Sequence, residues 1–291
     1  MTELVLTKLE QPARAVPKAT AEPLWVKWTL IGVCLVFLSL FLVLPLSVVL
    51  FGAFELGLQV WWDAVSEPDA LAAIRLTLLV LLIVVPLNAI FGVAIAWAIA
   101  KFEFKGKTLL ISVIDMPFAI SPVVVGLIFV ILFGSQGWLG PWLAAHDLKI
   151  VFAIPGIIIV ILFGTLPFVA RELIPLMQQQ GKEEEEASLT LGASGWQTFW
   201  RVTLPNIKWG LIYGVVLCNA RAMGEFGAVA IVSGRIRGET NTMPLHIEVL
   251  YNEYMFTAAF AVSSLLTGLA LVTIVLKSWV EYKDERRHKT A

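Results

Sequence analysis

The feature that most constrains this chain is a series of six long stretches with few or no charged residues: residues 29–51, 76–100, 109–133, 150–170, 209–232 and 256–276. A bilayer core about 30 Å thick needs roughly 20 apolar residues of helix, so each stretch is long enough to cross a membrane. The chain is 58% hydrophobic and only 15% charged, whereas an ordinary soluble domain carries about 25% charged residues. The sequence therefore excludes a typical soluble enzyme and predicts an all-α integral membrane protein with six transmembrane helices.

Two of the six spans contain ionisable residues. Span 109–133 holds Asp115 together with Pro117 and Pro122. Prolines at this spacing predict a bent or interrupted helix, whose freed backbone groups must meet protein or water. Such a break can line a transport path, with Asp115 as a candidate pathway residue, or it can be a packing kink near the inner end of the span. The sequence leaves both interpretations open.

Span 209–232 contains Arg221 and Glu225, which are four residues apart and share one face of a helix. A charge at the bilayer centre costs at least about 2.5 kcal/mol on insertion scales, so both should face protein or a water-filled path. In one interpretation Arg221 contacts an oxyanion in transit, because a guanidinium matches the oxygens of a tetrahedral anion. In the other, Glu225 neutralises Arg221 and the pair fixes helix packing.

Lysine and arginine are unevenly distributed between the segments that join the spans. With the N-terminus inside, sixteen of the 21 basic residues fall in the four inner segments, which are residues 1–28, 101–108, 171–208 and 277–291. Cytoplasmic loops retain basic residues. Both termini are therefore predicted to be cytoplasmic, with residues 1–28 as an N-terminal segment and residues 277–291 as a C-terminal tail.

The longest inner connection, residues 171–208, has features of helical structure. Four consecutive glutamates, Glu183 to Glu186, open a segment with interspersed apolar residues. Carboxylates in a first turn favour the positive end of the helix dipole, and Pro205 resists continuing a helical hydrogen-bond ladder. We therefore expect a helical segment on the cytoplasmic face, ending before Pro205.

The same connection contains a motif of fixed spacing. It reads Glu186-Ala187-Ser188, three residues, Gly192, nine residues, Val202-Thr203-Leu204-Pro205. This resembles the EAA loop of ABC-importer membrane subunits, whose pattern is E-A-A, three residues, G, nine residues, I-x-L-P. Ser188 and Val202 are mild departures from that pattern. The resemblance implies that the loop couples the chain to an ATPase through Glu186, Ala187, Ser188, Gly192, Leu204 and Pro205.

Small residues in this motif have a physical reason. A short helix that docks into a groove needs Ala187, Ser188 and Gly192 where backbones approach closely, and Gly192 can adopt positive φ where helix gives way to turn. An amphipathic helix on the membrane surface, or a solvated acidic face, is the alternative interpretation of the same residues.

The resemblance extends from Trp28 to Lys277. The runs IDMPFAISPVVVGL (residues 114–127), PFVAREL (167–173) and NARAMGEFGAV (219–229) are similar to those of sulfate/thiosulfate importer permease subunits of the CysW type. This resemblance implies the MetI-like ABC-importer permease fold and transport of sulfate or thiosulfate. A permease for molybdate, tungstate or another oxyanion is the alternative. Molybdate and tungstate are tetrahedral dianions like sulfate, so they require similar binding groups.

The chain carries no complete nucleotide-binding loop. The fragment Gly106-Lys107-Thr108 has Lys101 where a phosphate-binding loop requires its first glycine. The resemblance implies that ATP and Mg²⁺ bind a partner ATPase, present in two copies, and that this chain has no cofactor of its own. It also implies a second homologous permease subunit in a heterodimer, an extracytoplasmic sulfate/thiosulfate-binding protein, and a multi-pass location in the plasma (inner) membrane.

A membrane enzyme is the competing class of function. The three histidines, His146, His246 and His288, are scattered, and no metal-ligand cluster or nucleophile–base set is visible. Only the intramembrane charges favour an enzyme, since such charges can be catalytic. We expect no catalytic residues and no metal site. A net charge of −1 shows no basic surplus, so no nucleic-acid partner is expected.

Overall fold

A computed structural model of the chain describes residues 23–288, with side chains described as far as Trp279. Within that range every regular element is a helix. The chain divides into two units, residues 1–49 and 50–291, which are considered separately. Residues 1–22 of the predicted N-terminal segment and residues 289–291 of the predicted tail lie outside the described residues, and the cytoplasmic location of both segments stays a prediction.

The first predicted span is helical throughout, as α2 (Leu24–Leu38), the π-helical turn η2 (Ser39–Val43) and α3 (Leu44–Phe54). The π turn lies immediately before Leu44-Pro45. Proline has no backbone N–H and its ring crowds the carbonyl four residues earlier, and a widened turn accommodates both effects. Together the three elements form a 31-residue apolar helix, longer at both ends than the predicted 29–51.

The second span belongs to α5 (Pro68–Lys101), which follows the short helix α4 (Leu58–Ser66). Helix α5 has proline in its first turn, where the missing N–H has no intrahelical partner to lose. It begins eight residues before the predicted start at residue 76. The predicted outer loop between the first two spans is therefore largely helical.

The third span is broken, as the prolines predicted. Helices α6 (Lys107–Ala119) and α7 (Pro122–Phe133) are bent by 110° at the break between them. Ser121 precedes Pro122 and has extended backbone, with ψ 134°, which is the conformation that a following proline favours. The short helix α8 (Gly140–Ala145) follows α7.

Helix α9 (Ile154–Gln180) begins four residues after the predicted start of the fourth span at residue 150 and continues ten residues beyond its predicted end at residue 170. The chain then forms α10 (Glu183–Thr190), α11 (Gly195–Thr198) and the π-helical turn η3 (Phe199–Thr203). The expectation that Pro205 ends this helical segment is wrong. Here too a π turn precedes a Leu-Pro pair, and the chain passes directly into α12 (Leu204–Met223).

The fifth predicted span, 209–232, is not one helix. Helix α12 ends at Met223, and α13 (Gly227–Val232) begins after a three-residue interruption. Helices α14 (Met243–Asn252) and α15 (Phe256–His288) complete the chain, and α15 contains the sixth span.

Among the described residues, four helical stretches are long and apolar enough to cross a membrane: Leu24–Phe54, Pro68–Lys101, Ile154–Gln180 and Phe256–Trp279. The bent pair α6–α7 adds a fifth if it is counted as one crossing. Helix α12 is not in this set, so the structure supports four or five spans and the predicted total of six stays a prediction.

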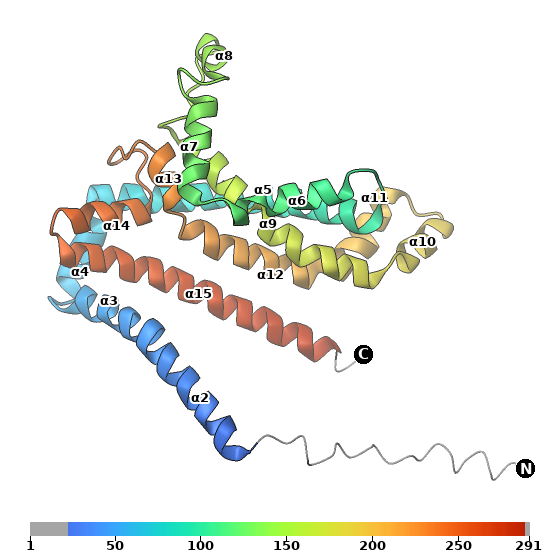
Figure 1. Cartoon of the computed structure of the whole chain (residues 1–291), viewed down its shortest axis with the longest axis horizontal. Coiled ribbons are helices and arrows are strands. Elements are labelled where there is room, and N and C mark those ends of the chain that lie inside the picture. The colour runs from blue at the N-terminus through green and yellow to red at the C-terminus, as the bar shows by residue number, and fades with distance from the viewer. Residues whose placement is uncertain (1–22, 289–291) are drawn as a thin grey trace, which may run out of the picture. The chain divides into compact units, whose positions relative to one another are not determined.

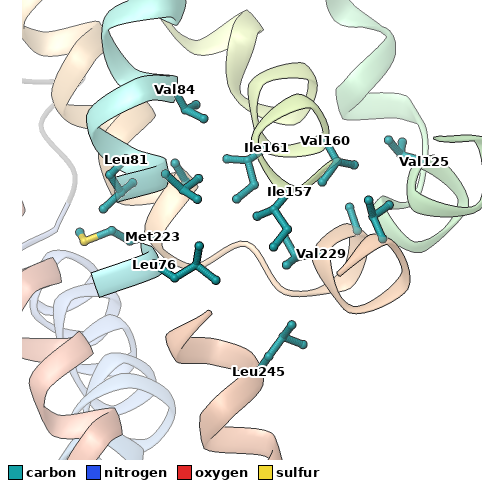
Figure 2. Packing of buried hydrophobic residues seen from close by; sticks show 14 residues of the cluster. Leu76, Leu81, Val84, Val125, Ile157, Val160, Ile161, Met223, Val229 and Leu245 are labelled. Atoms are coloured by element: carbon teal, nitrogen blue, oxygen red, sulfur yellow. The ribbon is translucent and has the colours of Figure 1, made fainter. Parts of the chain in front are cut away.

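In the second unit, α9 lies against both α5 and α12 (Figure 1), and these three helices form its centre. Figure 2 shows Ile157, Val160 and Ile161 of α9 between side chains of α5 and of α7 and α13. Small residues allow the backbones to approach closely: a Cβ atom on Gly214 of α12 would lie 3.1 Å from the Cα of Val169. Such contacts are typical of helices that pack within membranes.

Candidate functional site

The EAA segment, defined as residues 183–205, is a helix, a turn and a second helical stretch. Its four glutamates occupy the first turn of α10, as the dipole argument predicted. Gly192 lies in the turn after α10 and has φ +89°, which confirms the expected positive φ. Ser194 then caps α11 through reciprocal hydrogen bonds with Gln197. The segment lies at the end of α9 (Figure 1).

The six motif residues are not one continuous surface patch. Glu186, Ala187 and Gly192 are exposed, whereas Ser188 is half-buried and its hydroxyl lies 3.1 Å from the hydroxyl of Thr198. Leu204 packs against the apolar cluster between α5, α9 and α12. Pro205 is exposed in the first turn of α12. Leu204 therefore joins the segment to the helix core.

Large apolar side chains of the EAA segment are exposed beside the motif: Leu189, Leu191, Trp196 and Trp200. Leu191 is 88% exposed and Trp196 is 69% exposed. Exposed large apolar side chains gathered in one short segment are typical of an interaction site. These residues favour the docking interpretation of the motif over a merely solvated acidic face.

The predicted pair of Arg221 and Glu225 is formed, but the two residues do not share a helix face, because Glu225 lies in the break between α12 and α13. Nη1 of Arg221 lies 2.7 Å from Oε2 of Glu225. Glu225 is buried, with its side chain 4% exposed, whereas the side chain of Arg221 is 38% exposed. Glu225 also accepts a long hydrogen bond of 3.4 Å from the backbone N–H of Ala228. The pair thus combines a fixed carboxylate with a more accessible guanidinium.

The break in the third span lies next to this pair. A cavity of about 20 Å³, enough for one water molecule, is lined by residues of α6, α7, α9, α12 and α13. The lining includes Pro117, Pro122, Gly164, Arg221 and Glu225. The structure thus brings together two features that are about a hundred positions apart in the sequence.

Asp115 is not in the lining of that cavity. Its carboxylate lies 2.7 Å from Nε of Arg171, near the middle of α9, and Cζ of Arg171 lies 4.9 Å from the ring centroid of Phe118. Sequence reasoning placed Arg171 only by its side of the membrane and missed this pair, because its partners are on different helices. The pair links α6 to α9 beside the break.

No group of three or more His, Cys, Asp or Glu side chains in the described part of the chain is placed to hold a metal ion. His246 of α14 is 2% exposed, and burial lowers the pKa of its imidazole. His146 is exposed, and its ring lies tilted against that of Trp142 in the segment around α8. The two histidines that the structure describes fully have no shared site.

Residues 88–288 match the family model described as binding-protein-dependent transport system inner membrane component. The match covers more than half of the chain, and the chain therefore belongs to this family of multi-pass transport permeases.

Within the family, the chain is similar to proteins that are named as sulfate permeases. It is 48% identical to the sulfate transport system permease protein CysW of Escherichia coli K12, over 93% of this chain and 94% of that protein. It is 51% identical to CysW of Synechocystis, over 89% and 94% respectively. It is 35% identical to the sulfate transport system permease protein CysT of Escherichia coli K12, over 88% and 93%.

A solved structure shows the same fold. A chain of a bacterial alginate ABC transporter, in complex with an alginate-bound periplasmic protein, superposes with a TM-score of 0.74 over 90% of this chain and 94% of that chain. The two sequences are 17% identical. The fold is the all-helical, MetI-like fold of ABC permeases.

Proposed function

We propose that this chain is a translocating subunit of an ATP-driven importer that carries sulfate or thiosulfate across the plasma (inner) membrane. The observation that carries the proposal is the identity of 48–51% to proteins named sulfate transport system permease protein CysW, over at least 89% of this chain. The chain itself catalyses no reaction in this proposal. It supplies the path, and ATP with Mg²⁺ binds a separate ATPase.

The partners follow from the same relationship. The second membrane subunit resembles CysT, which is related to this chain at 35% identity. One of two ATPase copies docks on the exposed apolar side chains of the EAA segment, and the other copy docks on the second membrane subunit. An extracytoplasmic sulfate/thiosulfate-binding protein delivers the anion, in keeping with the family description.

The proposed topology has six crossings with both termini in the cytoplasm. Helices α12 and α13 together make the fifth crossing, and the bent pair α6–α7 makes the third. The interruption between α12 and α13 and the break at Pro122 lie at one small cavity. Irregular backbone at membrane depth is tolerated where it is buried in protein or lines a water-filled path.

In this path Arg221 is the residue that meets the oxyanion. Its guanidinium has five donors in a fixed fork and stays charged at any physiological pH. Glu225 holds the guanidinium in place and keeps the free protein neutral at that depth. Asp115 acts through Arg171 by fixing the inner half of the broken span.

The test is uptake of labelled sulfate by cells with and without this gene, in competition with unlabelled thiosulfate and molybdate. We expect uptake that depends on the gene and is suppressed by thiosulfate. Suppression by molybdate at equal concentration, without suppression by thiosulfate, would instead assign the chain to a molybdate importer.

A further inference from the structure

A buried lysine connects the EAA segment to the helix core. Lys101 is the last residue of α5 and is only 8% exposed. Its ammonium donates a hydrogen bond of 2.5 Å to the carbonyl of Gly181, the residue that follows α9. The same nitrogen lies 3.1 Å from Oε1 of Glu185, in the first turn of α10. One side chain of α5 thus contacts the end of α9 and the start of α10.

Glu185 extends this contact to a third helix. The oxygen that pairs with Lys101 also accepts a hydrogen bond of 2.8 Å from the hydroxyl of Thr203. Thr203 is 2% exposed and immediately precedes α12. Lys101, Glu185, Thr203 and the Gly181 carbonyl form what we call the inner clamp. It joins the inner ends of α5, α9 and α12 to α10.

Polar contacts, and not a hydrophobic face, hold α10 in place. None of the residues of α10 is buried. Besides the contacts of Glu185, the carboxylate of Glu184 accepts a hydrogen bond from Asn206 of α12. A helix without a buried apolar stripe has no packing of its own to fix its orientation. The clamp therefore sets where α10 points.

Because the charge of Lys101 is buried, the inner clamp depends on all of its members. A buried ammonium needs both a counter-ion and hydrogen-bond acceptors, and removal of one partner leaves the other uncompensated. Lys107 and Glu103 are a natural comparison, because their atoms are 2.8 Å apart in the same inner region. Glu103 is 83% exposed and only four residues from Lys107, so that pair joins no two distant helices.

We propose that Lys101 and Glu185 are positioning residues that fix α10 against the inner ends of α5, α9 and α12. When the ATPase moves the EAA segment, the three central helices then move with it as one body. The inference rests on the proposed coupling of this chain to an ATPase, and adds the residues by which a displacement of α10 reaches the membrane helices.

The experiment uses the complete complex in proteoliposomes: this chain, the partner permease, the ATPase and the binding protein. The variants are Lys101→Met and Glu185→Gln, with Lys107→Met as the matched control. We expect the amount of sulfate transported per ATP hydrolysed to fall about fivefold or more in the two clamp variants. A change of about fivefold is at the lower end of the typical range for energetic coupling between two sites. The control should keep the wild-type ratio. Lys101→Arg, which retains the charge, should recover most of it.

A second measurement keeps the test informative if transport is lost for another reason. Hydrogen exchange of the amides of residues 183–190 should be faster in full-length Lys101→Met than in wild type, and unchanged in Lys107→Met. Assembled clamp variants with a wild-type ratio and wild-type exchange would overturn the proposal. A wild-type complex that takes up no sulfate would overturn the proposed function alone, because the exchange measurement needs no substrate.

Discussion

Two ion pairs in this chain, Lys101–Glu185 and Arg221–Glu225, each contain at least one deeply buried partner. They differ in the sequence separation of the two partners and in the exposure of the cation. Lys101 and Glu185 come from helices far apart in the sequence, and their side chains are 7% and 17% exposed. Arg221 lies in the last turn of α12 and Glu225 lies four residues later in the break before α13, and Arg221 remains 38% exposed. The first pair has both charges enclosed, whereas the second leaves its cation accessible.

This difference in exposure and separation indicates two different roles, the positioning of helices and contact with cargo. An enclosed pair between distant elements fixes their relative orientation, because neither charge can leave without stranding the other. The Arg221–Glu225 pair connects only the end of α12 to the break that follows it. In our proposal it holds and neutralises a cation that an anion can then approach. We therefore assign transmission of movement to the inner clamp and contact with cargo to Arg221. Each variant below tests one side of that assignment.

Lys101→Met has the largest expected effect on stability. It strands the Glu185 carboxylate in a mostly buried site, and loss of one partner of a buried pair typically destabilises by about 3 to 5 kcal/mol. Thermal unfolding of the purified chain in detergent measures the change. Adding Glu185→Leu should restore part of the lost stability, because the stranded charge is then removed. Equal midpoints for Lys101→Met and wild type would show that the pair is not enclosed.

The control for that prediction is Lys107→Met. The hydrogen bond from Lys107 lowers the pKa of Glu103, but Glu103 is fully hydrated and loses little when the lysine is removed. We expect no resolvable shift in the thermal midpoint. A shift as large as that of Lys101→Met would mean that any inner lysine matters equally, and the comparison would fail.

Arg221→Gln should destabilise less than Lys101→Met, because glutamine, unlike methionine, keeps an N–H donor on the side chain that faces the carboxylate. It should impair transport more specifically. Glu225 then loses a charge-assisted hydrogen bond worth about 1.5 to 3 kcal/mol. Because Arg221 is accessible, the larger consequence is expected in sulfate flux: uptake and ATP hydrolysis should fall together, with their ratio nearly unchanged. That outcome contrasts with the uncoupling expected of Lys101→Met. Normal uptake and coupling in Arg221→Gln would contradict a role in the path.

Gly192→Leu has a smaller expected effect on stability than Lys101→Met or Arg221→Gln. Gly192 has φ +89° with open space where a Cβ would lie, so the substitution adds backbone strain of about 1 to 2 kcal/mol without a clash. Its matched control is Gly195→Ala, at a glycine without positive φ and also in open space. We expect Gly192→Leu to reduce sulfate-stimulated ATP hydrolysis in the complex while Gly195→Ala does not. Unchanged stimulation in Gly192→Leu would remove the turn from the coupling route.

What could be predicted from the sequence was local. Absence of charge located the long helices, Pro117 and Pro122 indicated the break, and the four-residue spacing indicated the Arg221–Glu225 pair. Helix ends were missed, because α5 and α9 continue past the apolar stretches into segments with charged residues. The predicted helix end before Pro205 was wrong, because a π-helical turn accommodates the proline and the helix continues.

The clamp lay beyond such reasoning. Lys101 and the carbonyl of Gly181 are 80 residues apart, and no spacing rule connects a lysine at one helix end to a glutamate after another. The acidic run gave four equivalent glutamates, and only the packing of α10 distinguishes Glu185 from the exposed Glu186. The docking motif was visible in the sequence, but its attachment to the membrane helices was not.

Transport by the purified complex tests the central claim most directly. Proteoliposomes that contain this chain, the partner permease and the ATPase would be loaded with ATP on the ATPase side and supplied with binding protein and labelled sulfate on the other side. The account predicts sulfate accumulation that requires ATP and disappears when this chain is omitted. Accumulation at the same rate without this chain, or accumulation of molybdate but not of sulfate, would contradict it.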